Sequence, residues 1–367
     1  MATSSLMRVL KRLLVALLYY SGVLGLWMRR LQRQTSGTVG LVLAYHHIRD
    51  AAGGQSAPLS ELESGVTLAA FLEQVAYIVR NFEVLTVSEL LDRSLRQSAG
   101  TRIPLAISFD DGYRSVYSGA YPVLEKASAK ATVFVPSGYV DTERRYWWLD
   151  LSRFFANATR ESINRLVGEL RAKQIDEKLI ELLVDLQAET LAERIFWRGK
   201  IALRLDKMGE HQRQIVTEII ASLTEAKSGD EQTLVLTSSQ LKKLATDGWE
   251  IGAHTVNHVE LTSVDSETAL QELSNDKQAL ESNLGVTIQG LAYPYGRFGE
   301  AAMVLARRGG YKYAVTTTSA AVTADSNCYA IPRISIGLNP TLPQFAFTLC
   351  RTLRQSWRQY SLNRGCH

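Results

Sequence analysis

Residues 105–112 read Leu-Ala-Ile-Ser-Phe-Asp-Asp-Gly, an apolar run that ends in two adjacent carboxylates and a glycine. A short apolar run bounded by turn residues is typical of a strand buried on both faces, and Gly112 permits a sharp exit from it. Asp110 and Asp111 therefore stand at the carboxyl end of a predicted strand, where the active sites of α/β folds lie. Taken alone, the pair fits a surface turn or a helix cap equally well.

Similar short apolar runs recur along the chain and alternate with helical patterns. Apolar residues at the helical period predict a helix over 67–81, with Thr67 as its N-cap. The predicted strands, including the one that precedes Asp110, are 41–44, 103–109, 131–135, 249–252, 290–293 and 313–316. Strands that alternate with helices indicate an α/β fold with a largely parallel sheet or barrel.

The composition limits the kind of protein that the chain can be. The chain has 367 residues, of which 46% are hydrophobic and 21% are charged, so it must bury at least one large core. The 41 basic and 37 acidic residues nearly balance, so the chain lacks the large excess of positive charge that would indicate nucleic-acid binding. Cys328, Cys350 and Cys366 are odd in number and lack a zinc-knuckle spacing, so we expect neither a disulfide scaffold nor a catalytic thiol.

Strand signals are absent between Asp141 and Thr237, where leucine and charged residues recur at helical spacing. We therefore predict a helical insertion at residues 142–236. It opens with Tyr146, Trp147 and Trp148, which either pack the insertion onto the main domain or form a stacking platform for sugar rings.

The amino terminus contains an uncharged run of sixteen residues, 13–28. The basic residues that flank it are Arg8, Lys11, Arg12, Arg29, Arg30 and Arg33. At 1.5 Å per residue a helix of this length reaches roughly 24 Å, against about 30 Å of hydrocarbon, so the run predicts membrane attachment and leaves a full span open. No small-x-small cleavage site follows, and a buried helix of the soluble domain is the alternative.

A second motif, His254-Thr-Val-Asn-His258, comes just after the predicted strand 249–252. Its spacing predicts two imidazoles on one side of a helical turn. Two histidines and one carboxylate leave open positions on Zn²⁺ or a similar divalent ion, which is the arrangement of a catalytic metal site.

Residues 108–112 and 254–258, together with Leu291-Ala-Tyr-Pro-Tyr-Gly296, resemble the three ordered motifs of the NodB-like polysaccharide deacetylases of the carbohydrate esterase family 4 type. The resemblance covers about 39–347 outside the insertion. It implies a distorted (β/α) barrel and metal-dependent removal of an acyl group from an N-acylated sugar.

The resemblance also implies a role for each motif residue. Asp111, His254 and His258 would hold a divalent metal ion, with Zn²⁺ the expected one. Asp110 would act as general base on a water molecule. The backbone N–H of Tyr295 would stabilise the oxyanion.

The third motif departs from the common family pattern at Ala292, where many relatives have an arginine that pairs with the base. Arg333, in Ile331-Pro-Arg-Ile-Ser335, is the best substitute in this chain. Its alternative role is an ordinary structural salt bridge.

The family's usual late histidine is also missing, because no histidine follows His258 until His367. Some deacetylases of the superfamily carry instead an amino-terminal Tyr-His motif, which Tyr45 and His46 match. We therefore expect His46 to be the proton donor, with a hydrogen-bonded core histidine as the alternative role. Alternation along the strand predicts that His47 points to the opposite face.

The predicted organisation is a membrane-anchor segment and linker at 1–37, a deacetylase domain at 38–347 and a basic tail at 348–367. The predicted protein is an N-deacetylase at the bacterial inner membrane, acting on an amino-sugar in a surface polysaccharide or a lipid-linked oligosaccharide precursor. The alternatives are a deformylase of a lipid-linked amino-sugar and a non-catalytic carbohydrate-binding protein on the same fold.

Overall fold

The computed structural model describes residues 2–35, 39–49, 65–95, 102–186, 190–224, 234–337 and 340–363. These residues divide into two compact units. The first contains the amino-terminal helices, the sheet and the carboxyl-terminal helix. The second contains the helices between residues 143 and 234. Cys366 and His367 lie outside the described residues.

The first unit is built on a sheet in the order β10, β1, β5, β6, β7, β8 and β9. These strands are β1 (Val39–Tyr45), β5 (Pro104–Phe109), β6 (Thr132–Val135), β7 (Glu250–Ala253), β8 (Gly290–Ala292), β9 (Tyr313–Val315) and β10 (Val322–Thr323). All of them run parallel except β10. Every residue of β1, β5 and β6 is buried, because both faces of a parallel sheet are covered. The predicted α/β class is confirmed.

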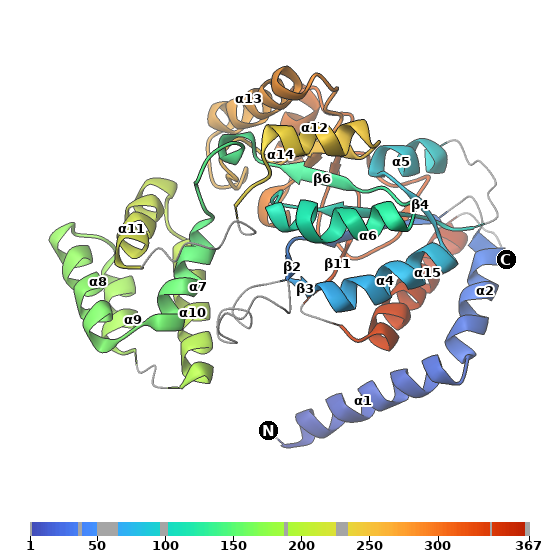
Figure 1. Ribbon diagram of the computed structural model, residues 1–367, viewed down its shortest axis with the longest axis horizontal. Helices are drawn as coiled ribbons and strands as arrows, with labels where there is room; N and C mark the ends of the chain where they lie inside the picture. Colours follow the sequence, from blue (N-terminus) through green and yellow to red (C-terminus); the bar gives the residue numbers. More distant parts are fainter. Residues whose placement is uncertain are drawn as a thin grey trace. The chain divides into compact units, whose positions relative to one another are not determined.

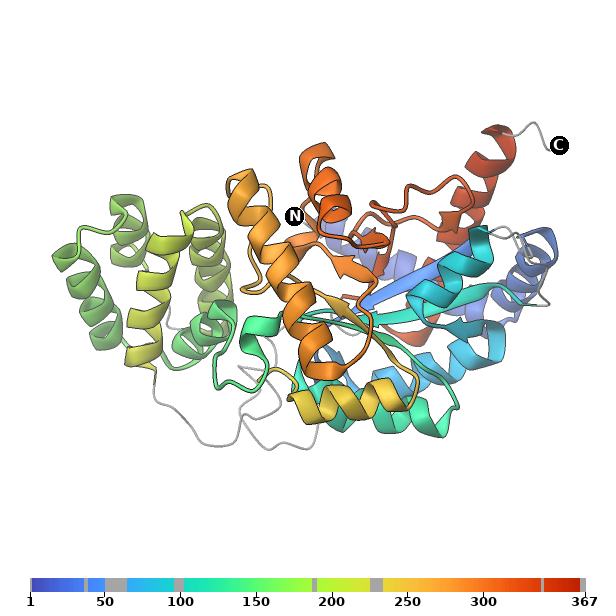
Figure 2. The ribbon, with the colours of Figure 1, turned by 90° about the horizontal axis from the view of Figure 1, so that it is seen from above.

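Helices surround this sheet (Figure 1), and the view from above shows them on its outside (Figure 2). They are α4 (Leu68–Asn81), α5 (Val87–Leu95), α6 (Tyr121–Lys126), α12 (Ser238–Thr246), α13 (Ser266–Leu284) and α14 (Glu300–Arg308). The predicted helix at 67–81 is confirmed as α4, and the Thr67 hydroxyl caps it by accepting a hydrogen bond from the N–H of Ala70 at 3.3 Å.

The predicted barrel takes the form of a curled half-barrel. Residues 331–335 lie between its first and last parallel strands, since Ile331 forms a bridge to Val315 of β9 and Ile334 pairs with Leu43 of β1. The strand in this segment, β11 (Ile334–Ser335), is only two residues long, so few backbone pairs join the segment to β1. It nevertheless brings the segment that contains Arg333 beside β1.

The second unit consists of helices, in the range where we predicted an insertion. They are α7 (Trp147–Asn157), α8 (Arg160–Ala172), α9 (Glu177–Val184), α10 (Leu191–Asp206) and α11 (Glu210–Leu223). They share their own core, which includes Phe155 and Leu170. Tyr146 is buried and stacks on Trp148, with ring centroids 4.5 Å apart, and Trp147 packs against this core. Tyr146 and Trp147 therefore pack within the insertion, which argues against a sugar platform at these two residues.

The amino-terminal apolar run does not form one helix. Gly22, with φ of 79°, separates α1 (Ala2–Tyr20) from α2 (Val23–Thr35), and the two helices are bent by 70°. Among the described residues no single helix is long and apolar enough to span a bilayer, although this bent pair meets the criteria of length and composition together. The expectation of one continuous anchor helix is therefore wrong.

Both amino-terminal helices contact α15 (Leu342–Asn363). Leu24, Met28 and Leu31 of α2 are buried, so this part of the run belongs to the packed unit. The described part of the range expected as a basic tail, 348–363, continues α15 and buries Leu349 and Leu353. The predicted basic tail is therefore helical over these residues, and its arginines occupy the exposed side of a helix whose other side is apolar.

The packing of α2 predicts unequal effects of one substitution at two nearby positions. Leu24 is 1% exposed and Leu26 is 61% exposed. Leu24→Ala should lower the free energy of unfolding by about 2–5 kcal/mol, because it removes buried methyl groups and leaves a cavity. Leu26→Ala should change it by no more than about 0.5 kcal/mol. Denaturant unfolding of both variants checks this, and equal small losses would mean that α2 does not pack on the unit.

Candidate active site

The two carboxylates at the end of β5 point to different partners because the backbone turns sharply between them. The N–H of Asp110 still donates to the carbonyl of Tyr45, as part of the parallel sheet, at 2.9 Å. Asp111 then adopts a left-handed conformation with φ of 66°, which aspartate tolerates better than most residues. Gly112 is also left-handed, and a Cβ there would lie 3.0 Å from Val135. Asp110 and Asp111 are 3% and 4% exposed.

Asp110 forms a buried, bidentate ion pair with Arg333. The two terminal guanidinium nitrogens of Arg333 donate to the two carboxylate oxygens of Asp110, each at 2.6 Å. Arg333 also donates to the Ser108 hydroxyl at 3.1 Å and to the Thr316 carbonyl at 2.9 Å. Burial raises the pKa of Asp110, but the charge and hydrogen bonds of Arg333 outweigh it and hold this pKa below its usual value.

Asp111, His254 and His258 form the cluster predicted as a metal site. One ligand atom from each lies within 4.8 Å of the others, and all three residues are buried. Oδ1 of Asp111 is 3.3 Å from Nε2 of His254 and 3.2 Å from Nε2 of His258. Burial raises the pKa of Asp111, but its interactions with His254 and His258 reverse this and leave it far below its usual value.

The hydrogen bonding of His254 shows that these residues fit a cation. Nδ1 of His254 is 2.7 Å from the carbonyl of Ala292, which can only accept a hydrogen bond, so Nδ1 carries a proton. In the neutral ring Nε2 then presents a lone pair to the carboxylate of Asp111. Two facing acceptors repel each other unless a proton or a metal ion lies between them, and a second imidazole at the same oxygen favours the metal ion.

The histidine motif folds differently from the predicted helical turn. Residues 254–258 form an irregular turn with positive φ at Thr255 and His258, 62° and 57°. The Thr255 hydroxyl supports this turn by accepting a hydrogen bond from the N–H of Val259 at 2.9 Å. The ring centroids of His254 and His258 are 4.7 Å apart, so this turn brings the imidazoles together without a helix.

Asp276 of α13 is a positioning residue that the sequence analysis missed. One of its carboxylate oxygens accepts the backbone N–H of His254 and the other accepts the N–H of Ser137, each at 2.8 Å. Burial raises the pKa of Asp276 to about 6. The helical pattern could have identified Asp276, because it lies among the buried apolar residues of α13, between Leu273 and Leu280. A carboxylate on the apolar face of a helix needs such partners.

The two histidines after β1 have different surroundings. His46 is half-buried and lies within electrostatic range of both carboxylates, where a protonated imidazole would lower the pKa of Asp110 and Asp111 in addition to the larger effects above. His47 is buried, and its Nδ1 forms a hydrogen bond with the Ser115 hydroxyl at 2.8 Å. The two imidazoles therefore lie in different environments, in line with the alternation expected along a strand.

Tyr295 lies in a short turn after β8, within the 3-10 segment Pro294–Gly296. Its backbone is left-handed, with φ of 58° and ψ of 6°. Its ring packs edge-on against that of His258 at 4.8 Å between centroids. The third motif therefore contacts the histidine motif directly, which places the turn at Tyr295 beside the cluster of Asp111, His254 and His258.

The profile of the polysaccharide deacetylase family matches residues 98–175 and 205–314, which make up half of the chain. The polysaccharide deacetylase homologue YxkH of Bacillus subtilis is 30% identical over 101 residues, 28% of this chain and 36% of that protein. The poly-beta-1,6-N-acetyl-D-glucosamine N-deacetylase of Staphylococcus aureus is 29% identical over 111 residues, 28% of this chain and 38% of that protein. The matches thus span less than two fifths of these relatives.

Among solved structures, the Streptococcus pyogenes deacetylase PplD in complex with acetate is similar in fold. The TM-score is 0.54 at 18% sequence identity, and the alignment covers 86% of this chain and 98% of PplD. At this identity the similarity concerns the fold alone.

The buried ion pair predicts a strong coupling between Arg333 and Asp110. Arg333→Met should lower the free energy of unfolding at neutral pH by about 3–5 kcal/mol, because it leaves a buried carboxylate unpaired. In an Asp110→Asn background the same change should cost much less. Denaturant unfolding of the four proteins measures this coupling, and additive losses would contradict it.

The pH dependence of this coupling has a defined sign. The folded pKa of Asp110 is held below its ordinary value near 3.8. The contribution of Arg333 is therefore complete above that value and is lost as the pH falls below it. The difference between wild type and Arg333→Met should shrink in acid.

Proposed function

The chain belongs to the polysaccharide deacetylase family, and from this membership and the site geometry we propose that it is a metal-dependent N-deacetylase of an amino-sugar. The substrate would be a surface polysaccharide or its lipid-linked oligosaccharide precursor. One observation carries the proposal: a carboxylate paired with Arg333 stands directly beside the cluster of Asp111, His254 and His258. Such a site can hold a water molecule next to both a base and a cation.

Asp111, His254 and His258 would hold the divalent ion, and their nitrogen and oxygen donors suit Zn²⁺. When bound, the ion supplies polarisation of the amide carbonyl and a lower pKa for a water molecule. The hydrogen bonds of Asp276 and Ala292 support the role of His254, because they fix its backbone and ring.

Asp110 would accept the proton of the attacking water. Its pairing with Arg333 supports this role in two ways, since it keeps the carboxylate ionised and fixes its orientation. Arg333 would thus replace the arginine that many relatives have at the position of Ala292. It is a positioning residue, because it acts through Asp110.

His46 would donate a proton to the departing amine, and the backbone N–H of Tyr295 would stabilise the oxyanion. The half-buried position of His46 near both carboxylates supports the first role. Imidazole can carry a transferable proton near neutral pH, which a departing amine requires. The turn at Tyr295, packed on His258, supports the second.

We also propose that the protein works at the bacterial inner membrane. The exposed apolar side chains of α1 support this location, and a lipid-linked substrate would be reached there.

The test of this function is hydrolysis by the full chain of acetylated and formylated amino-sugar glycans, with acetate and formate measured. Acetate release that a chelator abolishes and added divalent metal restores is the expected result. Release of formate alone would identify a deformylase instead. Stoichiometric metal and glycan binding with neither product would indicate a carbohydrate-binding protein.

Two neighbouring substitutions should separate the base from the ligands. Asp110→Asn should keep the bound metal and lose turnover, because an amide cannot accept the proton of water. Asp111→Ala should lose the metal itself, because it removes one of three protein ligands. Metal analysis alongside turnover checks this, and equal metal loss in both variants would refute the division of roles.

The proton donor is tested at the two histidines after β1. His46→Ala should lower turnover by about a hundredfold to ten-thousandfold with metal content intact, because general acid catalysis is typically worth that much. His47→Ala should mainly lower the melting temperature, because it removes a buried hydrogen bond to Ser115. Near-normal turnover of His46→Ala would rule His46 out as the donor.

A further inference from the structure

Helix α1 lies at the outer edge of its unit (Figure 1), and several of its apolar side chains are exposed. Met7, Leu10, Leu14 and Leu17 recur at helical spacing on one face, and each is more than half exposed. Val15, on the opposite side of the helix, is buried. A surface helix of a soluble protein has the reverse arrangement, and a contiguous exposed apolar patch marks a contact surface.

The three packed helices α1, α2 and α15 carry charges of one sign. Each has three basic residues and no acidic one, although the whole chain has 41 basic and 37 acidic residues. Apolar side chains beside basic ones match the boundary of an anionic bilayer, where acyl chains lie beside phosphates. A second copy of the chain fits this surface poorly, because it would bring like charges together.

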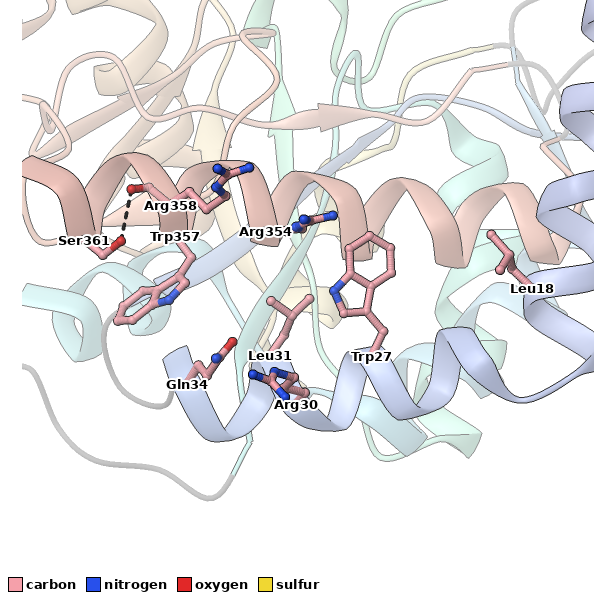
Figure 3. Close-up of a pocket in the computed structure, with 9 residues that line it drawn as sticks. All are labelled: Leu18, Trp27, Arg30, Leu31, Gln34, Arg354, Trp357, Arg358 and Ser361. Carbon is pink, nitrogen blue, oxygen red and sulfur yellow. Dashed lines mark hydrogen bonds between the residues drawn. The ribbon is translucent and has the colours of Figure 1, made fainter. Parts of the chain in front are cut away.

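A pocket lies between α2 and α15, with one lining residue from α1 (Figure 3). It encloses about 590 Å³, and none of the described residues that line it carries a carboxylate. Its lining includes Leu18, Trp27, Arg30, Arg354, Trp357 and Arg358. Leu18 comes from α1 and follows the exposed Leu17, so the pocket lining includes the same helix that carries the apolar stripe.

The chemistry of this lining suits a phosphate at a membrane surface. The guanidinium carbon of Arg354 lies 5.4 Å from the ring centroid of Trp27, which holds the charge at the pocket. Guanidinium groups form paired hydrogen bonds with phosphate oxygens. Indole rings favour the boundary between acyl chains and headgroups, because one end of the ring is apolar and the other is polar.

We propose that α1 lies in the plane of an anionic membrane leaflet, and that the pocket between α2 and α15 binds the phosphate of an anionic phospholipid. The exposed face of α1 enters the acyl region, while Arg30, Arg354 and Arg358 surround the headgroup phosphate. This inference rests on the proposed membrane association and is independent of the proposed hydrolysis.

The test measures binding of the full chain to vesicles of phosphatidylcholine alone and of phosphatidylcholine mixed with phosphatidylglycerol. The triple variant Arg30→Gln, Arg354→Gln, Arg358→Gln should bind mixed vesicles at least about tenfold more weakly than wild type. The matched control is Arg29→Gln, Arg33→Gln, Arg351→Gln, which removes the same charge from the same two helices outside the pocket lining. Its affinity should fall less than about threefold. Equal losses in the two triple variants would overturn the pocket, because they indicate general attraction only.

The apolar face of α1 is tested with a second pair of variants. Leu17→Gln should weaken binding to both vesicle types, whereas Val304→Gln, at an exposed apolar position on α14, should change neither. An unchanged Leu17→Gln variant would overturn the in-plane helix. A solution dimer that Leu17→Gln dissociates, with vesicle binding unaltered, would overturn it as well.

Hydrolysis of a soluble glycan, measured in parallel, separates this inference from the proposed reaction. Wild type that hydrolyses the glycan but binds neither vesicle type would overturn the membrane inference and leave the reaction standing. Wild type that binds mixed vesicles through the pocket but hydrolyses nothing would do the opposite.

Discussion

The ion pair between Asp110 and Arg333 is the constraint on which the active site depends. Both charges are buried, so each would be costly without the other. The pair joins the end of β5 to a segment more than two hundred residues later, and it requires the sheet to curl until residues 331–335 lie beside β1. The curled shape of the sheet and the ionisation of Asp110 are therefore linked, because the curl brings Arg333 to Asp110 and the charge of Arg333 keeps that carboxylate ionised.

The same pair explains how two adjacent carboxylates come to have different partners. Because Arg333 holds Asp110 on one side and the left-handed backbone of Asp111 turns its side chain away, only Asp111 faces the two histidines. The histidines are in turn positioned by their own partners, a carbonyl at Ala292 and a carboxylate at Asp276. Each group at the candidate metal centre is thus oriented by a neighbour that would not touch the metal.

The amino-terminal helices show how packing divides one apolar run between two uses. Past the bend at Gly22, α2 buries Leu24 and Met28 within the unit, as any core helix does. Before the bend, α1 leaves its apolar face exposed, so the two parts of the run have different physical requirements. The unit that carries the candidate site and its amino-terminal helices are therefore one packed structure, in which the elements proposed to meet the membrane also contribute to the core.

The sequence by itself determined the α/β class, the cap of α4 and the three motifs at strand ends, because these depend on local periodicity and on residue type. Only the tertiary structure decided that Arg333 reaches Asp110, that Asp276 holds the backbone of His254, and that Gly22 divides the apolar run. Residues 348–363 likewise could not be read as the end of α15 from their charges. The physical reason is common to all of these: a long-range contact or a change in backbone direction depends on which surfaces the folded sheet brings together, and no local pattern encodes that.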